Sequence, residues 1–133
     1  FCRRVIGPVM DGRRVVHFGK RGPWVSPIHV RDCARALVHL AEYGKPGGRY
    51  FLVNDDPIRT HEFAETFARL ANRPLRVWRV PAAVTRLVVG PILADHIQAD
   101  AMFSNMRLRG LGFWFEYPTL EQGVQQVLGL LRE

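Results

Sequence analysis

Glycines beside basic residues are the first groups in this sequence that could do chemistry, because a glycine-rich turn can surround the phosphates of a nucleotide. Two stretches contain them, Gly19-Lys20-Arg21-Gly22 and Gly44-Lys45-Pro46-Gly47-Gly48. The first lacks a third glycine and leads into Pro23, and the second follows an expected helix instead of opening one. Neither GxGxxG nor a Walker sequence is present, so we expect this chain alone to bind no NAD, NADP or nucleoside triphosphate.

Metal ligands and nucleophiles are the next candidates, and their spacing fits neither role. The five histidines include no HxxxH pair, and Cys2 and Cys33 form no CxxC pair. Ser26, Ser104 and Cys33 carry nucleophilic atoms, but none lies in a nucleophile elbow, and Cys33 falls on the apolar face of an expected helix. Asp55-Asp56 precedes a proline, a composition typical of turns. We therefore expect no metal site and no catalytic residue in this chain.

The net charge of +7 suggests nucleic-acid binding at first sight, because clustered lysines and arginines neutralise phosphates. The distribution argues against this class: the only lysines are Lys20 and Lys45, and the arginines are scattered through every segment. The apolar stretch around Val84 to Val89 is far shorter than the ~20 residues that cross a bilayer. We expect neither a nucleic-acid nor a membrane partner, and the low cysteine content favours a reducing, cytoplasmic setting.

Strands and helices alternate along the chain. The Tyr50 to Val53 run is continuously apolar, the pattern of a strand buried on both faces, and the proline in the Ser26 to Val30 run confines that strand to a sheet edge or a strand start. The remaining two short strands are expected at Arg14 to Phe18 and at Leu75 to Val80.

Helices are predicted from apolar residues at spacings of three and four and from capping residues. Asp32 is expected to cap a helix whose apolar face holds Cys33, Ala36, Leu37, Leu40 and Ala41, and which ends at Gly44. The further helical segments are Thr60 to Leu70 capped by Thr60, Ala82 to Val89, His96 to Met102, a short turn from Ser104 to Leu108, and a last helix that begins with the capping-box pair Thr119 and Gln122.

The order of several motifs resembles one family. The stretch from Ser26 to Leu37 has a His-Val-x-Asp segment followed by an alanine-containing helix, Gly47 to Asn54 resembles a late "GxxYnl" strand, and Thr60 to Phe63 resembles a "t-x-x-E-F" helix start. Arg73 to Pro81 is similar to a "kP…vP" stretch, Ser104 to Phe113 to "s-n-x-K-l-x-x-L-G-f", and Tyr117 to Gly123 to "yPtleeG". In this order and spacing, the motifs resemble extended short-chain dehydrogenases/reductases, of the NAD-dependent epimerase/dehydratase family.

The resemblance implies an α/β fold in which residues 1–133 are the C-terminal, substrate-side portion of a Rossmann-type enzyme: its last sheet strand and a small α/β cap. In that family a glycine-rich turn and a Tyr-xxx-Lys catalytic element precede the region that corresponds to this chain. Tyr43, Tyr50 and Tyr117 each lack a lysine four positions later. The resemblance therefore implies that the N-terminal Rossmann half, which would bind NAD or NADP, is a partner absent from this chain.

Substrate contacts are implied for five residues. Nucleotide-sugar-binding members carry an arginine four residues before the motif histidine, where this chain has Val25, and Arg21 or Arg107 could supply the missing guanidinium. Trp24 and Ser26 would line the pocket on the loop before the motif. His29 is the motif histidine, for which a packed structural role is the alternative.

The sequence thus favours a fragment of an NAD(P)-dependent epimerase, dehydratase or reductase that contributes binding of a small-molecule substrate, with a nucleotide sugar as one substrate class. We expect no turnover from the chain alone. A stand-alone, non-catalytic module for a small ligand is the alternative. Because a strand buried on both faces would lose its neighbours, we also expect the isolated chain to self-associate or rearrange.

Overall fold

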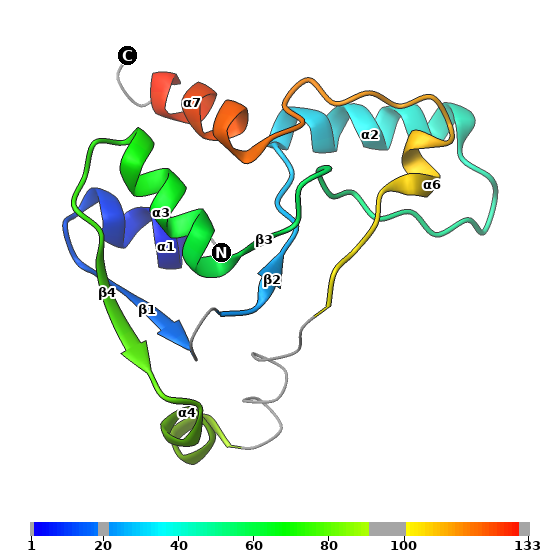
Figure 1. The fold of residues 1–133 in the computed structure, drawn as a ribbon. Coiled ribbons are helices and arrows are strands. Elements are labelled where there is room, and N and C mark those ends of the chain that lie inside the picture. The colour runs from blue at the N-terminus through cyan, green and yellow to red at the C-terminus, as the bar shows by residue number, and fades with distance from the viewer. Residues whose placement is uncertain (1, 19–21, 91–100, 131–133) are drawn as a thin grey trace. The chain divides into compact units, whose positions relative to one another are not determined.

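The computed structural model describes residues 2–18, 22–90 and 101–130, and these form two compact units, each assembled from two stretches of the chain. Unit 1 comprises Phe1–Val25 and Ile58–Ala101, and unit 2 comprises Ser26–Pro57 and Met102–Glu133. Helices and strands are interleaved along most of the described chain, which confirms the α/β class (Figure 1).

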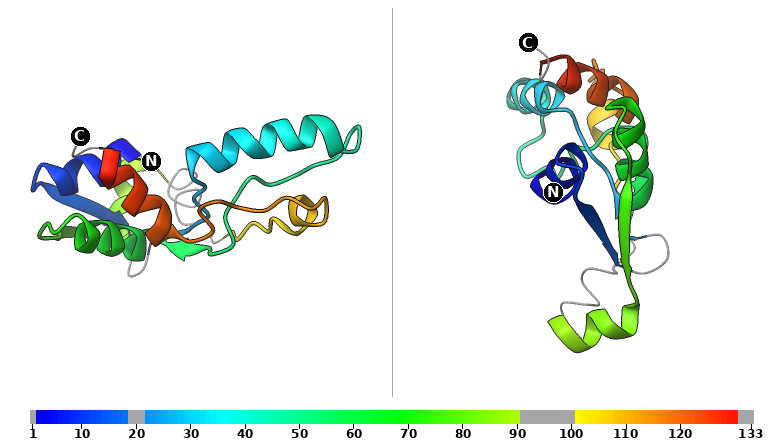
Figure 2. Two further views of the ribbon diagram at one scale, coloured as in Figure 1. Left: turned by 90° about the horizontal axis from the view of Figure 1, so that it is seen from above. Right: turned by 90° about the vertical axis from the view of Figure 1, so that its left-hand side faces the viewer.

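Unit 1 is built on a pair of parallel strands. Strand β1 (Arg14–Phe18) pairs with β4 (Arg76–Val80), with Val15 opposite Val77 and His17 opposite Arg79. Helices α1 (Cys2–Met10) and α3 (Thr60–Leu70) pack against each other and against β1, as the views in Figures 1 and 2 show. The core of this unit includes the buried side chains Val5, Val9, Val15, Phe63 and Phe67.

Two further elements complete the described part of unit 1. The two-residue strands β2 (Trp24–Val25) and β3 (Ile58–Arg59) pair antiparallel, with Trp24 opposite Arg59. Helix α4 (Ala82–Val89) follows Pro81 and ends at Gly90, whose φ of 84° lies in the left-handed region that glycine adopts at least cost.

Unit 2 contains helices α2 (Val30–Tyr43), α6 (Met106–Arg109) and α7 (Leu120–Leu130). Its core cluster joins Ala36 of α2, Leu108 of α6, and Phe113 and Phe115 of the connection from α6 to α7. The two phenylalanine rings meet edge to face with centroids 5.1 Å apart, an arrangement that their quadrupoles favour. The connection runs along α2 in Figure 1, and its Glu116 and Tyr117 N–H groups donate to Asp32 of that helix.

Several elements were predicted correctly. Strands β1 and β4 and helices α3, α4 and α7 occupy the expected segments, and α2 ends at Gly44 as expected. The capping box of α7 is formed: Thr119 N–H donates to Gln122 Oε1 (3.3 Å), and Gln122 N–H donates to Thr119 Oγ1 (3.4 Å).

Helix α1 was not predicted. Of the predicted helix from His96 to Met102, residues 96–100 lie outside the described residues, and residues 101 and 102 are not helical.

The strand predicted from Ser26 to Val30 is wrong. Strand β2 ends at Val25, residues 26–29 are a loop, and α2 already begins at Val30. Pro27 has no backbone N–H to offer a sheet, and its carbonyl instead accepts from Asn54 N–H at 3.0 Å. His29 takes the capping position that was assigned to Asp32, because its side chain accepts from the backbone N–H of Arg31.

The strand predicted from Tyr50 to Val53 is also not formed. None of the four strands in the described part of the chain belongs to unit 2, so no strand of this unit is available to pair with the segment. Val53 is buried, but Phe51 is half exposed. A strand needs a hydrogen-bonded neighbour as well as an apolar sequence, and here the neighbour is missing. A smaller error concerns α3, which Arg59 precedes as the capping residue, with Thr60 already inside the helix.

Candidate functional site

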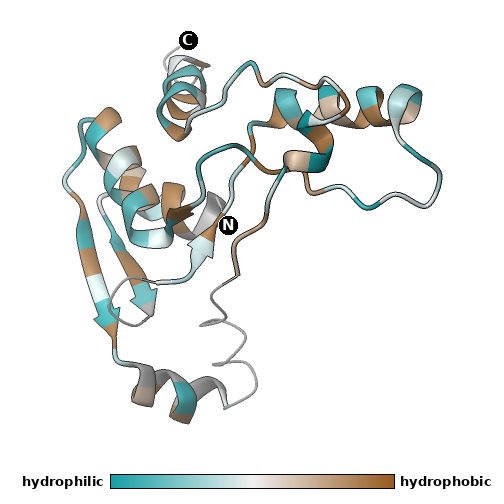
Figure 3. Cartoon of the chain, turned by 45° about the vertical axis from the view of Figure 1, so that its right-hand side comes forward, coloured by the Kyte–Doolittle hydropathy of each residue, from teal (hydrophilic) through white to brown (hydrophobic). Residues whose placement is uncertain are grey.

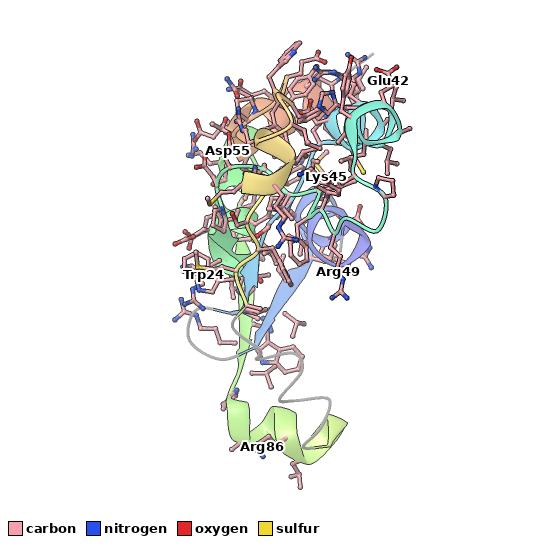
Figure 4. The ribbon with its side chains drawn as sticks, turned by 90° about the vertical axis from the view of Figure 1, so that its right-hand side faces the viewer. Trp24, Glu42, Lys45, Arg49, Asp55 and Arg86 are labelled. Atoms are coloured by element: carbon pink, nitrogen blue, oxygen red, sulfur yellow. The ribbon has the colours of Figure 1, made fainter. Side chains whose placement is uncertain are left out.

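Trp24 is held in place by its neighbours on β3 and α3. The Arg59 guanidinium carbon lies 4.2 Å from the centroid of the Trp24 ring, and Arg59 Nη1 donates to the carbonyl of Gly22 at 3.1 Å. Thr60 Oγ1 donates to the carbonyl of Pro23 at 2.9 Å. The indole, labelled in Figure 4, is partly exposed. Trp24 was expected on a loop, but it lies in strand β2, which Arg59 and Thr60 hold in place.

Arg21 and Ser26 flank Trp24 in the sequence and have different outcomes. Arg21 lies outside the described residues. The Ser26 hydroxyl oxygen is buried and finds no hydrogen-bond partner in the part of the chain that the structure describes. A buried hydroxyl without a partner is costly, so Ser26 Oγ is a polar atom that a ligand or a water molecule could satisfy.

His29 has partners for both ring nitrogens. Nδ1 accepts from the Arg31 backbone N–H at 3.3 Å, and Nε2 lies 2.9 Å from Gln126 Oε1 on α7. Because an accepting nitrogen carries no proton, the neutral ring holds its proton on Nε2 and donates it to Gln126. The ring also contacts that of Tyr117, with centroids 4.1 Å apart and the two planes tilted by 43°. His29 thus joins the start of α2 to α7, an arrangement that supports its packed structural role.

Asp32 makes a second connection from the first turn of α2. Its carboxylate is fully buried and accepts the backbone N–H groups of Glu116 and Tyr117, both at 2.8 Å. Arg35 Nη1 pairs with the same carboxylate at 2.8 Å. Asp32 therefore fixes the Glu116-Tyr117 backbone against α2, and with it the Tyr117 ring that contacts His29. His29 and Asp32, the histidine and aspartate of the motif, thus each connect the start of α2 to residues that lie far away in the sequence.

Arg107 lies on α6, where its Nη1 donates to the carbonyl of Arg49 at 3.4 Å. Arg107 is exposed, and its hydrogen-bond partner differs from those of His29, so the two side chains are not joined through a common residue. The predicted substrate contact of Arg107 therefore rests on the resemblance alone.

Asp55 lies beside α6 and anchors that helix (Figure 4). Asn105 Nδ2 donates to Asp55 Oδ1 at 2.8 Å and to the Val53 carbonyl at 3.0 Å, and Arg109 pairs with the same carboxylate. Partial burial opposes ionisation of Asp55, but the hydrogen bonds from Arg109 and Asn105 and the charge of Arg109 outweigh it and lower the pKa. Asp55 is therefore a structural carboxylate, in agreement with the turn assigned to it from the sequence.

An open cleft of about 570 Å³ in unit 2 was not predicted from the sequence. It lies between α2 and residues 112–114 and is lined by Arg35, His39, Tyr43, Phe113 and Trp114, among others. The Arg35 guanidinium stacks on Trp114 at 4.0 Å, and His39 Nε2 lies 3.0 Å from the Leu111 carbonyl oxygen. The residues that line it come from segments about seventy positions apart, which is why sequence spacing could not show it.

Within the described ranges, no group of three or more histidine, cysteine, aspartate or glutamate side chains is arranged to hold a metal ion. None of the helices there is long and apolar enough to cross a membrane. No contact in the described part of the chain suggests a catalytic set, and the sequence offers no glycine-rich turn for a dinucleotide.

Comparison with known proteins gives consistent relatives, although no family model matches the chain. An epimerase family protein of Staphylococcus aureus is 27% identical over 110 residues, which are 83% of this chain and 36% of the relative. One from Staphylococcus saprophyticus is 30% identical over 112 residues, with the same two shares. The chain thus spans little more than a third of the length of the curated relatives that it matches.

Two solved structures show the same fold over nearly the whole chain. Human epimerase family protein SDR39U1 with NADPH matches 96% of this chain and 43% of its own, with a TM-score of 0.76 and 21% identity. The dTDP-glucose 4,6-dehydratase of Bacillus anthracis in complex with NAD matches 96% of this chain and 37% of its own, with a TM-score of 0.72 and 16% identity. The α/β fold therefore matches part of an epimerase-type short-chain dehydrogenase.

Proposed function

Because the chain is a distant relative of epimerase-family proteins of the extended short-chain dehydrogenase/reductase type, we propose that it is the substrate-side portion of an NAD(P)-dependent epimerase, dehydratase or reductase. In this proposal it contributes contacts to a small-molecule substrate, and the dinucleotide and the catalytic residues belong to an N-terminal Rossmann half that is its partner. The Tyr50 to Val53 segment would then pair with a strand of that half.

One combination of observations supports assigning substrate contacts to this chain and the catalytic residues to the N-terminal half. The fold matches about two fifths of proteins that were solved with NADPH or NAD, while the sequence contains neither a glycine-rich turn nor a Tyr-xxx-Lys element. Since extended dehydrogenases need both, a chain without them cannot carry out the hydride step by itself. The half-exposed Phe51, in a segment with no strand to pair with in its own unit, is consistent with a missing neighbour.

Substrate contacts are proposed for Arg21, Trp24, Ser26, His29 and Arg107. The best supported is Trp24, because Arg59 and Thr60 contact strand β2 around it and the indole is partly exposed. A substrate held against a fixed aromatic ring loses less entropy than one held by a mobile loop. A nucleotide sugar is the proposed substrate class, and Arg107 would then be a cation available to its diphosphate.

The proposal is tested by titrating NADH and NADPH separately into the purified 133-residue chain and following the fluorescence of the reduced nicotinamide. We expect no change with either, and no epimerisation or reduction of UDP-glucose with NAD or NADPH present. The same assays on the protein expressed with the coding sequence that precedes Phe1 should show dinucleotide binding. Tight binding of a dinucleotide by the 133-residue chain would overturn the proposal and favour a stand-alone ligand-binding module.

A further inference from the structure

The open cleft of unit 2 contains a carboxylate that the fold does not use. Polar and apolar residues are mixed along α2 (Figure 3), and residues of both kinds line the cleft. Its charged side chains are Arg35 and Glu42, and its exposed rings are those of Tyr43 and Trp114. The volume of about 570 Å³ lies within the range of about 300–1,000 Å³ that small-molecule sites occupy. The cleft therefore has the size and the mixture of groups of a ligand site.

The positive charge of Arg35 is already neutralised. Its Nη1 pairs at 2.8 Å with the carboxylate of Asp32, which is fully buried. Its guanidinium carbon lies 4.0 Å from the centroid of the Trp114 ring and 5.4 Å from that of Phe113. Drawing Arg35 away to bind an anion would leave a buried carboxylate without its counterion, which is costly. Arg35 therefore forms one side of the cleft and is not free to bind an anion.

Glu42 is in the opposite situation. Its side chain is exposed on the last turn of α2, and it is labelled in Figure 4. Among the residues that the structure describes, no hydrogen-bond donor or cation is bonded to its carboxylate. Lys45, three positions later, is not among the residues that line the cleft. The uncompensated charge of the cleft is therefore negative, although the chain as a whole carries +7.

The histidine and the exposed rings of the cleft also favour a cation. His39 Nε2 lies 3.0 Å from the Leu111 carbonyl oxygen, and because a carbonyl only accepts, this nitrogen carries the proton of the neutral ring and leaves Nδ1 as an acceptor. The ring of Tyr43 lies 4.7 Å from that of His39 and is 59% exposed, and Trp114 is 62% exposed. The face of an aromatic ring attracts cations, because its quadrupole is negative there.

We propose that this cleft binds a small organic cation. An ammonium group lies beside Glu42, and the apolar or aromatic skeleton that carries it lies on Tyr43 and Trp114. A metal ion fits less well, because it needs several ligands, and in the described ranges no group of three or more histidine, cysteine, aspartate or glutamate side chains could hold one. The inference goes beyond the proposed function, since none of the residues that line the cleft is among the proposed substrate contacts.

Three probes that share a phenyl ring test the sign of the charge that the cleft accepts. At neutral pH phenethylamine is a cation, phenethyl alcohol is neutral and phenylacetate is an anion. Each is titrated into the protein expressed from its natural gene, including the coding sequence before Phe1, with fluorotryptophan in place of tryptophan. Binding is followed by fluorine NMR, and the Trp114 resonance is the one that is missing from Trp114→Phe. We expect phenethylamine to shift this resonance with an affinity at least about fivefold higher than that of phenethyl alcohol, and phenylacetate to bind most weakly.

Two variants assign the binding to the cleft. Glu42→Gln removes the charge and keeps the size of the side chain, so it should weaken phenethylamine about fivefold to tenfold and leave phenethyl alcohol unchanged. Tyr43→Leu, at an exposed position, should weaken both probes, and it gives a second measurement if the first variant folds poorly. Glu116→Gln is the matched control, because Glu116 is exposed in the same unit and does not line the cleft. This control should bind all three probes as the unaltered protein does.

Several outcomes would overturn the inference. These are no shift of the Trp114 resonance with phenethylamine at up to about 10 mM, equal affinities for the three probes, stronger binding of phenylacetate, or an unchanged affinity in Glu42→Gln. Dinucleotide binding is measured separately on the same protein. The organic cation can therefore fail to bind while the proposed function stands, and the reverse is equally possible.

Discussion

At the scale of single residues, Asp32 has the most consequential contacts in unit 2. The buried carboxylate accepts two backbone N–H groups and pairs with Arg35, so three donors depend on it. We expect Asp32→Asn to destabilise the chain by about 2–4 kcal/mol, because an amide can accept at only one of its two positions and leaves a partly buried N–H facing a buried donor. Urea unfolding measures the loss.

Asp56→Asn is the matched control for this variant, because Asp56 is exposed and should change the unfolding free energy by less than about 0.5 kcal/mol. If the Asp32→Asn and Asp56→Asn variants have equal unfolding free energies, the hydrogen bonds from Glu116 and Tyr117 to Asp32 contribute nothing to stability.

His17 gives unit 1 a dependence on pH. Its side chain is buried in β1, its Nε2 has no hydrogen-bond partner among the described residues, and its pKa is lowered, first by burial and then by the charges of His61 and Arg79, against the opposing effect of Glu65. The unfolded chain therefore binds a proton more readily than the folded one. Stability is fully present above the unfolded value of 6.5 and is lost as the pH falls through 6.5 toward the lower folded pKa.

We expect the unfolding free energy to fall between pH 7.5 and pH 5.5, measured in urea at both values. In a His17→Leu variant, which removes the titrating group, the fall should be clearly smaller. Asp55 does not interfere, because its pKa is lowered from 3.8 and its contribution is lost only as the pH falls below that value. A His17→Leu variant with an unchanged pH dependence would assign the effect to another group.

His29 shows why residue roles were only partly predictable. The sequence indicated that this histidine matters, and left open a packed role or a substrate contact. Its partners Gln126 and Tyr117 lie 97 and 88 positions away, and no local pattern links them to it. Only the three-dimensional arrangement shows that both nitrogens are engaged.

At the scale of elements, the positions of most helices and the capping box of α7 were predictable, whereas the caps of α2 and α3 and the pairing of strands were not. The capping box of α7 depends on residues three positions apart, so its local signal was sufficient. By contrast, α2 was predicted with one apolar face, and the structure divides that face between the buried Ala36 and the exposed Leu37 and Ala41. The Tyr50 to Val53 run has the composition of a strand, but a strand exists only with a partner.

The capping box allows a direct measurement. Thr119→Ala removes the hydroxyl that accepts from the Gln122 N–H, and we expect a loss of about 1 kcal/mol in the unfolding free energy. Thr119→Ser keeps the hydroxyl and should lower the unfolding free energy by only about a few tenths of a kcal/mol. If the serine and alanine variants unfold at the same urea concentration, the hydroxyl does not cap α7.

At the scale of the whole molecule, exposed apolar surface is the dominant feature. The exposed side chains Val30, Leu37 and Val38 of α2, the half-exposed Phe51 and the 62% exposed Trp114 all belong to unit 2. We expect the isolated chain to self-associate, with an average mass in light scattering above 15.2 kDa that rises with protein concentration. Leu37→Glu should bring the mass closer to that of a monomer, whereas Gln125→Glu should not. A monodisperse monomer of the unaltered chain would contradict this expectation.

The arrangement of the two units has a consequence for synthesis. Each unit is assembled from two separate stretches, and the chain passes from one unit to the other after Val25, after Pro57 and after Ala101. Helix α2 leaves the ribosome long before Leu108, Phe113 and Phe115, which cover its inner side. At a synthesis rate of about 5–20 residues per second, the roughly 65 residues between α2 and Leu108 take several seconds to be made. The apolar inner side of α2 stays uncovered during that time. The nascent chain therefore passes through a period in which both sides of one helix are available to a chaperone.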